Sequence, residues 1–243
     1  MHDLNEKIAL VTGASRGIGA SVTRLLAAGG ADVIINFRSK GPRAQEVANA
    51  VRAAGRRAWL AQADITDEAE VHSMMQVAAE AGRIDLLILN ACGGLEKDKP
   101  ADYAMQLNLT AQERLVNLAL PLMPRGGRIV FVTSHLAHFY GQKPVHAVYE
   151  TVAASKQAGE LALRARLPEL TDKGISLVVV SGDMIEGTIT PKLMERASRG
   201  VIETRRQQAG TLPTVEEFAQ AIVQAAADTH LKSGAVIFVG STD

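Results

Sequence analysis

The stretch VTGASRGIGA, residues 11–20, decides how the rest of this chain is interpreted. It continues the apolar run KIALVT, and Gly13, Gly17 and Gly19 have the spacing Gly-x-x-x-Gly-x-Gly. Glycine at these positions lets the backbone turn sharply and approach a phosphate, and the free N–H groups of the following helix then point at the anion. An ordinary glycine-rich turn between a strand and a helix is the alternative. The place of the motif, after a buried-type strand near the N-terminus, favours a dinucleotide-binding loop.

Beyond this loop, short apolar runs of strand length alternate with longer stretches of helical spacing. The apolar runs are KIALVT, ADVIIN, RRAWLAQ, IDLLILN, GRIVFVT, GISLVVV and AVIFVG. The helical stretches cover residues 18–28, 43–54, 68–81, 103–123, 152–167 and 215–226. Continuous apolar strands that alternate with helices predict a parallel sheet covered on both faces. We therefore expect residues 1–243 to form a single α/β domain, doubly wound and of Rossmann type, with seven parallel strands.

Residues 182–213 interrupt this alternation. The segment is polar and carries Gly187, Gly200, Gly210 and two prolines. It follows the sixth apolar run, and ligands of open α/β sheets bind outside the carboxyl ends of the strands. We expect an irregular lid at about residues 183–213.

The composition excludes several classes of protein. The chain has 243 residues, 47% hydrophobic and 21% charged, which is ordinary for a globular protein. Lys+Arg and Asp+Glu are 26 each, so no net basic charge favours nucleic-acid binding. Cys92 is the single cysteine, which excludes an intrachain disulfide and argues against a zinc site. The apolar run near the N-terminus is too short for a signal sequence or a membrane span, so we expect a cytoplasmic protein without metal, nucleic-acid or membrane partners.

The end of the second apolar run selects the cofactor. An acidic residue there would bind a ribose 2′-hydroxyl and favour NAD. The run instead ends with Asn36, Phe37, Arg38 and Ser39. Arg38 and Arg16 of the glycine loop offer two guanidinium groups to a 2′-phosphate, and two solvated surface arginines are the alternative. The pattern predicts NADP(H) as cofactor.

Four further motifs, DLLILNACGG, LNLTAQ, GRIVFVTS and AASK, accompany TGASRGIG. Together they make nearly the whole chain resemble the short-chain dehydrogenase/reductase superfamily. The resemblance implies catalytic positions for Ser134, Lys156 and Asn108. In DLLILNACGG, Leu89 and Cys92 replace the Asn and Gly of the family motif. We interpret Cys92 as a small packing residue without a partner.

The resemblance also implies a set of cofactor-binding residues, contributed by the glycine loop, the ends of the strands and the catalytic helix. They are Gly13, Ser15, Arg16, Gly17, Ile18, Gly19, Arg38, Ser39, Asp64, Ile65, Asn90, Ala91, Gly93, Lys156, Ile185 and Thr188. Asp64 and Ile65 are implied to flank the adenine. Ile185 and Thr188 are implied to contact the carboxamide and the diphosphate.

The segment YETVAASK, residues 149–156, departs from the family pattern. The usual Tyr-x-x-x-Lys motif would place tyrosine at position 152, where Val152 stands. Tyr149 and Lys156 instead resemble the Tyr-x6-Lys arrangement of a divergent branch that includes bacterial enoyl-ACP reductases. Positions 149, 152 and 156 share one helix face, and Pro144 indicates that the helix begins close to Tyr149. Residues 181–182 are also Ser-Gly instead of the usual Pro-Gly, with one extra residue after them.

We predict that Tyr149 donates the proton. The segment between Ser134 and Lys156 is longer than the family pattern implies, so an insertion precedes Tyr149. The alternatives are that Tyr149 only lines the substrate cavity, or that another residue of this insertion donates. The candidates there are His135, His138, Tyr140 and His146.

The expected roles follow from this chemistry. Ser134 would hydrogen-bond the substrate oxygen and Tyr149 would protonate it. Lys156 would bind the nicotinamide ribose as a cation, and Asn108 would hold a water or the lysine. The predicted activity is NADPH-dependent reduction of a ketone, oxoacyl or polyketide-type carbonyl, free or carrier-bound. An enoyl-thioester reductase and a non-catalytic NADP(H)-binding regulator are the alternatives.

Small residues on the stretch 152–167 allow another helix to approach closely. They are Ala153, Ala154, Ala158, Gly159 and Ala162. Members of the superfamily usually assemble through this helix and the last strand. The resemblance therefore implies a homo-oligomer, a tetramer or a dimer.

Overall fold

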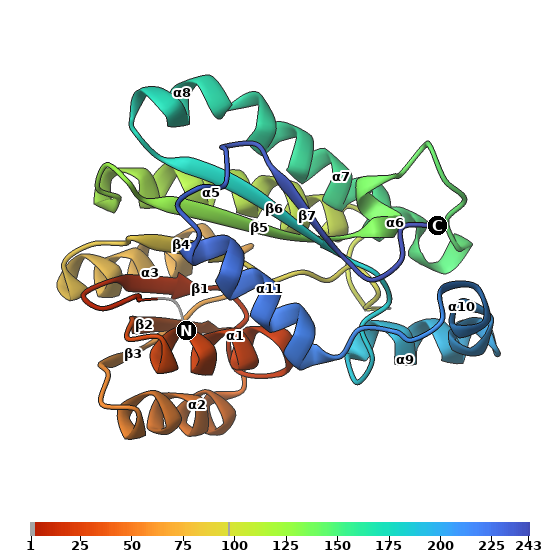
Figure 1. The fold of residues 1–243 in the computed structure, drawn as a ribbon, viewed down its shortest axis with the longest axis horizontal. Coiled ribbons are helices and arrows are strands. Elements are labelled where there is room, and N and C mark those ends of the chain that lie inside the picture. Colours follow the sequence, from red (N-terminus) through yellow and green to blue (C-terminus); the bar gives the residue numbers. More distant parts are fainter. Residues whose placement is uncertain (1–2, 97) are drawn as a thin grey trace.

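A computed structural model describes residues 3–96 and 98–243, and it contains the seven expected strands in one parallel sheet. The strands are β1 Ile8–Val11, β2 Asp32–Phe37, β3 Ala58–Gln62, β4 Leu86–Leu89, β5 Arg128–Ser134, β6 Ser176–Gly182 and β7 Val236–Val239. Their order is β3-β2-β1-β4-β5-β6-β7 (Figure 1). The order reverses between β1 and β4, which creates the crevice where such sheets bind ligands. The prediction of a doubly wound parallel sheet is confirmed.

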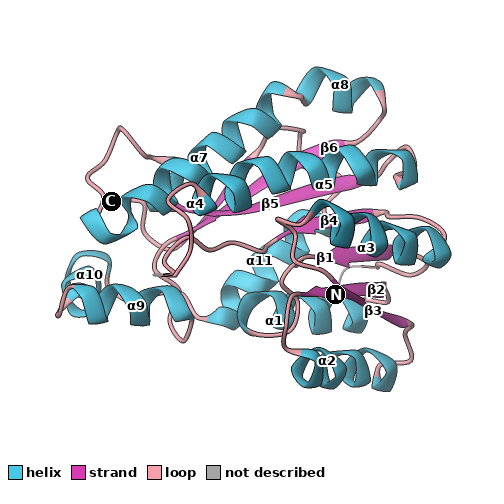
Figure 2. Cartoon of the chain, turned by 180° about the vertical axis from the view of Figure 1, so that it is seen from behind, coloured by secondary structure: helices cyan, strands magenta, loops and turns pink. Residues whose placement is uncertain are grey.

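Helices cover both faces of the sheet (Figures 1 and 2). One face carries α1 Gly17–Ala28, α2 Gly41–Ala53 and α11 Val215–Ala227, and the other carries α3 Glu68–Ala81, α5 Ala111–Ala119, α7 Glu150–Ala165 and α8 Leu167–Asp172. Successive side chains of a strand point to opposite faces. Ala9 and Val11 accordingly pack in one buried cluster, and Ile8 and Leu10 pack in the other. In the part of the chain that is described, no helix is long and apolar enough to cross a membrane.

The expected helix over 103–123 is broken into α4 Tyr103–Met105, a π-helical turn Gln106–Thr110, α5, and a 3₁₀ turn Leu120–Leu122. The π-helical turn lies against α7, where Gly159 meets the carbonyl oxygen of Asn108. A Cβ on Gly159 would collide with that oxygen. Gly159, one of the small residues of the stretch 152–167, therefore packs within the chain.

The segment expected as a lid, residues 183–213, is less irregular than predicted, because it contains two helices, α9 Ile189–Ala197 and α10 Val201–Ala209. Gly200, at φ 85°, makes the turn between them. The Glu195 carboxylate accepts hydrogen bonds from the backbone N–H groups of Gly200 and Ile202, at 2.7 and 3.2 Å. Met194 and Val201 are buried against the region of Tyr149. These apolar contacts are between distant segments, so local periodicity did not reveal them.

Candidate active site

The glycine loop after β1 is held by two buried or half-buried asparagines. The Asn36 Oδ1 accepts from the Gly13 N–H at 3.2 Å, and its Nδ2 donates to the carbonyls of Ala61 and Ala63. The Asn90 Nδ2 donates to the Thr12 carbonyl at 2.9 Å. The ends of β1, β2, β3 and β4 are thereby joined into one rigid phosphate-binding edge.

The N-terminus of α1 is open toward a ligand. Its N-cap residue, Arg16, makes no side-chain capping bond, so the first N–H groups of the helix have no side-chain acceptor there. A Cβ built on Gly17 would meet nothing within 4 Å. Free N–H groups facing open space match the requirements of an anion such as a pyrophosphate.

A cavity of about 930 Å³ runs from this loop to the lid helices. It is lined by nearly all of the residues singled out in the sequence, from the loop at Gly13 to Thr188. Of the predicted catalytic and cofactor-binding residues, Asn108 and Gly93 are the two that do not line it. Gly93 lies beneath the Glu96 side chain, whose carboxylate is 2.9 Å from where a Cβ on Gly93 would be.

Ser134 and Tyr149 meet at the substrate end of this cavity. Ser134 is the last residue of β5, and its Oγ is 3.1 Å from the Tyr149 phenol oxygen. Tyr149 ends the 3₁₀ turn Ala147–Tyr149, directly before α7. Val152, at the usual tyrosine position, is buried beside Tyr149 in an apolar cluster. The helix therefore begins where the sequence predicted.

Lys156 is buried in the same wall, at 5% exposure. Burial alone would lower the pKa of its ammonium group, but interactions with the Cys92 side chain and with Tyr149 outweigh burial and raise this pKa. Lys156 is therefore a cation at neutral pH. Cys92 is exposed in the cavity and interacts with Lys156, so the interpretation of Cys92 as a packing residue without a partner is wrong.

Asn108 makes two hydrogen bonds that the sequence did not indicate. Its Nδ2 donates to the Gly93 carbonyl and to the Ser155 Oγ, both at 3.0 Å. Within the described part of the chain, its buried Oδ1 has no partner, and no hydrogen bond joins it to Lys156. Asn108 thus ties the loop after β4 to α7.

The other candidate proton donors are placed differently. His138 and Tyr140 do not line the cavity, and His138 is 2.9 Å from the Glu160 carboxylate. His135 lines the cavity, but burial lowers its pKa to about 4. Exposed His146 also lines the cavity, without the hydroxyl partner that Tyr149 has in Ser134.

Arg38 has a partner that sequence analysis missed. Its Nη1 donates to the phenol oxygen of Tyr103 at 2.8 Å, and it lies 3.7 Å from the Asp64 carboxylate. Burial raises the pKa of Tyr103, and Arg38 only partly offsets this rise. Tyr103 therefore keeps a proton that it can donate. The two residues are 65 positions apart, so no local signal links them.

Comparison with known proteins identifies the family of this chain. A family model described as short chain dehydrogenase matches residues 7–198. The hydroxynaphthalene reductase arp2 of Aspergillus fumigatus is 35% identical over 187 residues, which cover 73% of this chain and 66% of that protein. The aligned region thus spans about two thirds of that relative's length.

Solved structures resemble the chain over almost its full length. The reductase LugOII, described as catalysing keto-reduction at C1 in lugdunomycin biosynthesis, superposes with a TM-score of 0.84 and 26% identity, covering 99% of both chains. A short-chain dehydrogenase of Burkholderia cenocepacia in complex with NADP gives a TM-score of 0.85 and 29% identity, covering 98% of this chain and 97% of the other. The chain described here belongs to the short-chain dehydrogenase family.

Proposed function

We propose that this chain is an NADPH-dependent reductase that converts a ketone of polyketide or oxoacyl type into an alcohol. The observation that carries the proposal is the 3.1 Å approach of the Ser134 and Tyr149 hydroxyls at the cavity wall. Two hydroxyls at this separation can both hydrogen-bond one carbonyl oxygen. Such paired donors stabilise the negative charge that develops on that oxygen during hydride addition.

The residues around the glycine loop fit a phosphorylated dinucleotide. The free N–H groups of α1 suit the pyrophosphate, and Arg38, with 47% of its side chain exposed, suits the 2′-phosphate. When bound, NADPH supplies the hydride. The chain itself supplies binding, orientation and the proton.

Tyr149 is the proposed general acid. Its phenol lies beside Ser134, and the Lys156 cation lies in the same buried wall. Ser134 orients the carbonyl oxygen, Tyr149 transfers its proton to that oxygen, and Lys156 favours the phenolate that remains. The nearby cation also suits the hydroxyls of the nicotinamide ribose.

The substrate end is mainly apolar around Tyr149. Leu136, Val145, Met184 and Met194 all line the cavity there and pack in the same cluster. Met side chains adapt to irregular shapes. These walls suit a bulky apolar ketone, such as an aromatic polyketide, better than a sugar. The similarity to a hydroxynaphthalene reductase and to LugOII supports this class.

An enoyl-thioester reductase is the second candidate, because Tyr149 precedes Lys156 by seven positions as in that branch. The test is NADPH oxidation with a panel of bicyclic aromatic ketones, oxoacyl thioesters and crotonyl thioester. Turnover of the ketones with an inert crotonyl thioester supports the proposal. The reverse favours the second candidate. NADPH binding without any turnover identifies a non-catalytic binding protein.

We also propose a homo-oligomer built on the outward face of α7. Ala154, Ala158 and Ala162 are half-buried on this helix, and Leu161 is 58% exposed. A flat face of small residues with one exposed leucine permits close packing against a second copy. Light scattering at micromolar concentration tests this: a dimer or tetramer mass supports it, and a monomer mass contradicts it.

A cytoplasmic location is proposed as well. Cell fractionation with an antibody to the native protein tests this location.

A further inference from the structure

The segment Ser241–Asp243, called here the tail segment, turns from the end of β7 over the substrate end of the cavity. Gly240 makes this turn at φ 89°. A Cβ on Gly240 would lie 2.7 Å from the Asp183 Cβ and 2.8 Å from the Pro213 Cγ, so only glycine fits without a shift. Thr242 and Asp243 then line the cavity.

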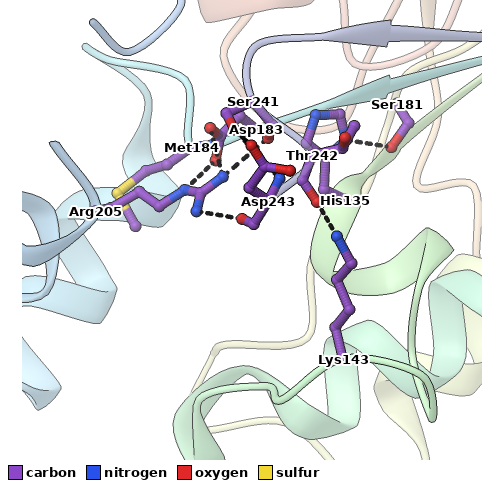
Figure 3. Close-up of polar contacts among 9 residues, drawn as sticks. All are labelled: His135, Lys143, Ser181, Asp183, Met184, Arg205, Ser241, Thr242 and Asp243. Carbon is purple, nitrogen blue, oxygen red and sulfur yellow. Dashed lines mark hydrogen bonds and ion pairs between the residues drawn. The ribbon is translucent and has the colours of Figure 1, made fainter. Parts of the chain in front are cut away.

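Arg205 links three parts of the chain here: the lid helix α10 that carries it, Asp183 after β6, and the tail segment (Figure 3). Its Nε and Nη2 donate to the two carboxylate oxygens of Asp183, at 2.8 and 2.9 Å. Its Nη2 and Nη1 also donate to the carbonyls of Ser241 and Asp243, at 2.8 and 2.7 Å. The planar guanidinium fork matches this arrangement, which an ammonium group could not reproduce.

The insertion before Tyr149 reaches the tail segment from the other side. The Lys143 Nζ donates to the carbonyl of Thr242 (Figure 3). The tail segment is thus held between the lid and the insertion, and both of them line the cavity. Three segments that are distant in the sequence close one wall of the substrate end.

The anchoring carboxylate is nearly buried. The Asp183 side chain is 6% exposed and that of Arg205 is 18% exposed. The Asp183 Oδ1 also accepts from the Met184 N–H at 2.7 Å, and Met184 contributes to the apolar wall. Removing Arg205 would leave a buried carboxylate without its cation, which is strongly unfavourable. Asp183 belongs to the stretch after β6 where the sequence departs from the family pattern.

We propose that Arg205 is a positioning residue that latches the lid and the tail segment over bound substrate. It does not touch the reacting atoms. By holding α10, Asp183 and the tail segment together, it sets the shape of the site that receives the ketone. The consequence for substrate binding rests on the proposed reductase function, whereas the latch itself does not.

The test compares Arg205→Ala and Arg205→Lys with Arg206→Ala. Arg206 is the matched control, because it is the next residue on α10 and also binds a carboxylate, Glu186, but in an exposed pair that does not reach the tail segment. Thermal melting first verifies that each variant is folded. For Arg205→Ala, the KM for the ketone should rise about tenfold or more. The kcat and the KM for NADPH should stay within about threefold of the wild type. The reason is that Arg205→Ala weakens the binding of the ketone and of its transition state equally, which leaves the chemical step unchanged.

Amide hydrogen exchange gives a second readout that needs no substrate. Exchange in residues 201–209 and 241–243 should accelerate in Arg205→Ala, less in Arg205→Lys, and not in Arg206→Ala. Unchanged exchange in Arg205→Ala would overturn the latch. So would a substrate KM that rises equally in Arg206→Ala. If the wild type turns over no ketone, the reductase proposal fails, and hydrogen exchange still decides whether the latch exists.

Discussion

The two ends of the cavity are built in different ways. At the nucleotide end, the glycine loop is held by hydrogen bonds among neighbouring strand ends, through Asn36 and Asn90. At the substrate end, the wall is assembled from the insertion, the lid and the tail segment, joined through Arg205 and Lys143. The first end is held by contacts among adjacent strand ends of the sheet. The second depends on side-chain contacts between segments outside the sheet.

The largest expected effect is at the substrate end. Tyr149→Phe removes the phenol hydroxyl and keeps the ring packing, so kcat should fall roughly 10²–10⁴-fold, the usual contribution of general acid catalysis. The affinity for NADPH, measured by fluorescence titration, should not change. Tyr140→Phe is the control, because that residue does not line the cavity. A near-normal kcat in Tyr149→Phe would assign the proton to another group, with His146 the next candidate.

At the nucleotide end, the double change Arg16→Ala with Arg38→Ala should affect one cofactor only. Charge-assisted hydrogen bonds contribute about 1.5–3 kcal/mol each, so losing both arginines should raise the KM for NADPH roughly a hundredfold or more. The KM for NADH should hardly change, since NADH lacks the 2′-phosphate. Steady-state kinetics with both cofactors measure this. Equal NADH and NADPH kinetics in the wild type would contradict the assignment of Arg38.

A smaller effect is expected at Tyr103. The phenol accepts a hydrogen bond from the Arg38 guanidinium at 2.8 Å, and because water can replace this acceptor at the half-exposed arginine, its loss should cost only about 0.5–1.5 kcal/mol. Tyr103→Phe should therefore raise the KM for NADPH roughly twofold to tenfold and leave kcat unchanged. The same change in a chain that already carries Arg38→Ala should add almost nothing, because the two residues act together. An additive effect in that double variant would show that Tyr103 acts independently of Arg38.

The smallest effect is a pH dependence of stability at the substrate end. Burial lowers the pKa of His135 from 6.5 to about 4, so the folded protein binds fewer protons than the unfolded chain between these values. The contribution to stability is fully present above pH 6.5 and is lost as the pH falls toward 4.

Thermal melting as a function of pH checks this point with His135→Gln, which cannot ionise. Across that window, the melting temperature of the wild type should fall more steeply than that of His135→Gln. His72→Gln serves as control, because His72 is exposed and should not change the slope. Parallel curves for the wild type and His135→Gln would show that His135 is not buried as a neutral group.

The contrast between the two ends also explains what the sequence could predict. The strands and the glycine loop follow from local apolar runs and glycine spacing, and the start of α7 at Tyr149 followed from the polar stretch before it. The lid helices were missed, because α9 and α10 are stabilised by burying Met194 and Val201 near Tyr149. Tyr103 and Arg205 were missed for the same reason: their partners are 65 and 22 or more positions away. The role of Cys92 beside Lys156 likewise appears only in three dimensions.

The central claim is that hydride goes to a carbonyl carbon while Tyr149 protonates the oxygen. NADPH deuterated at C4 of the nicotinamide tests it most directly, in turnover of a ketone substrate followed by mass spectrometry and NMR of the product. The account predicts deuterium on the carbinol carbon and none elsewhere, with the hydroxyl proton derived from solvent through Tyr149. Deuterium on the β carbon of a saturated thioester, formed from an enoyl thioester without any carbinol product, would contradict the account and identify an enoyl reductase instead.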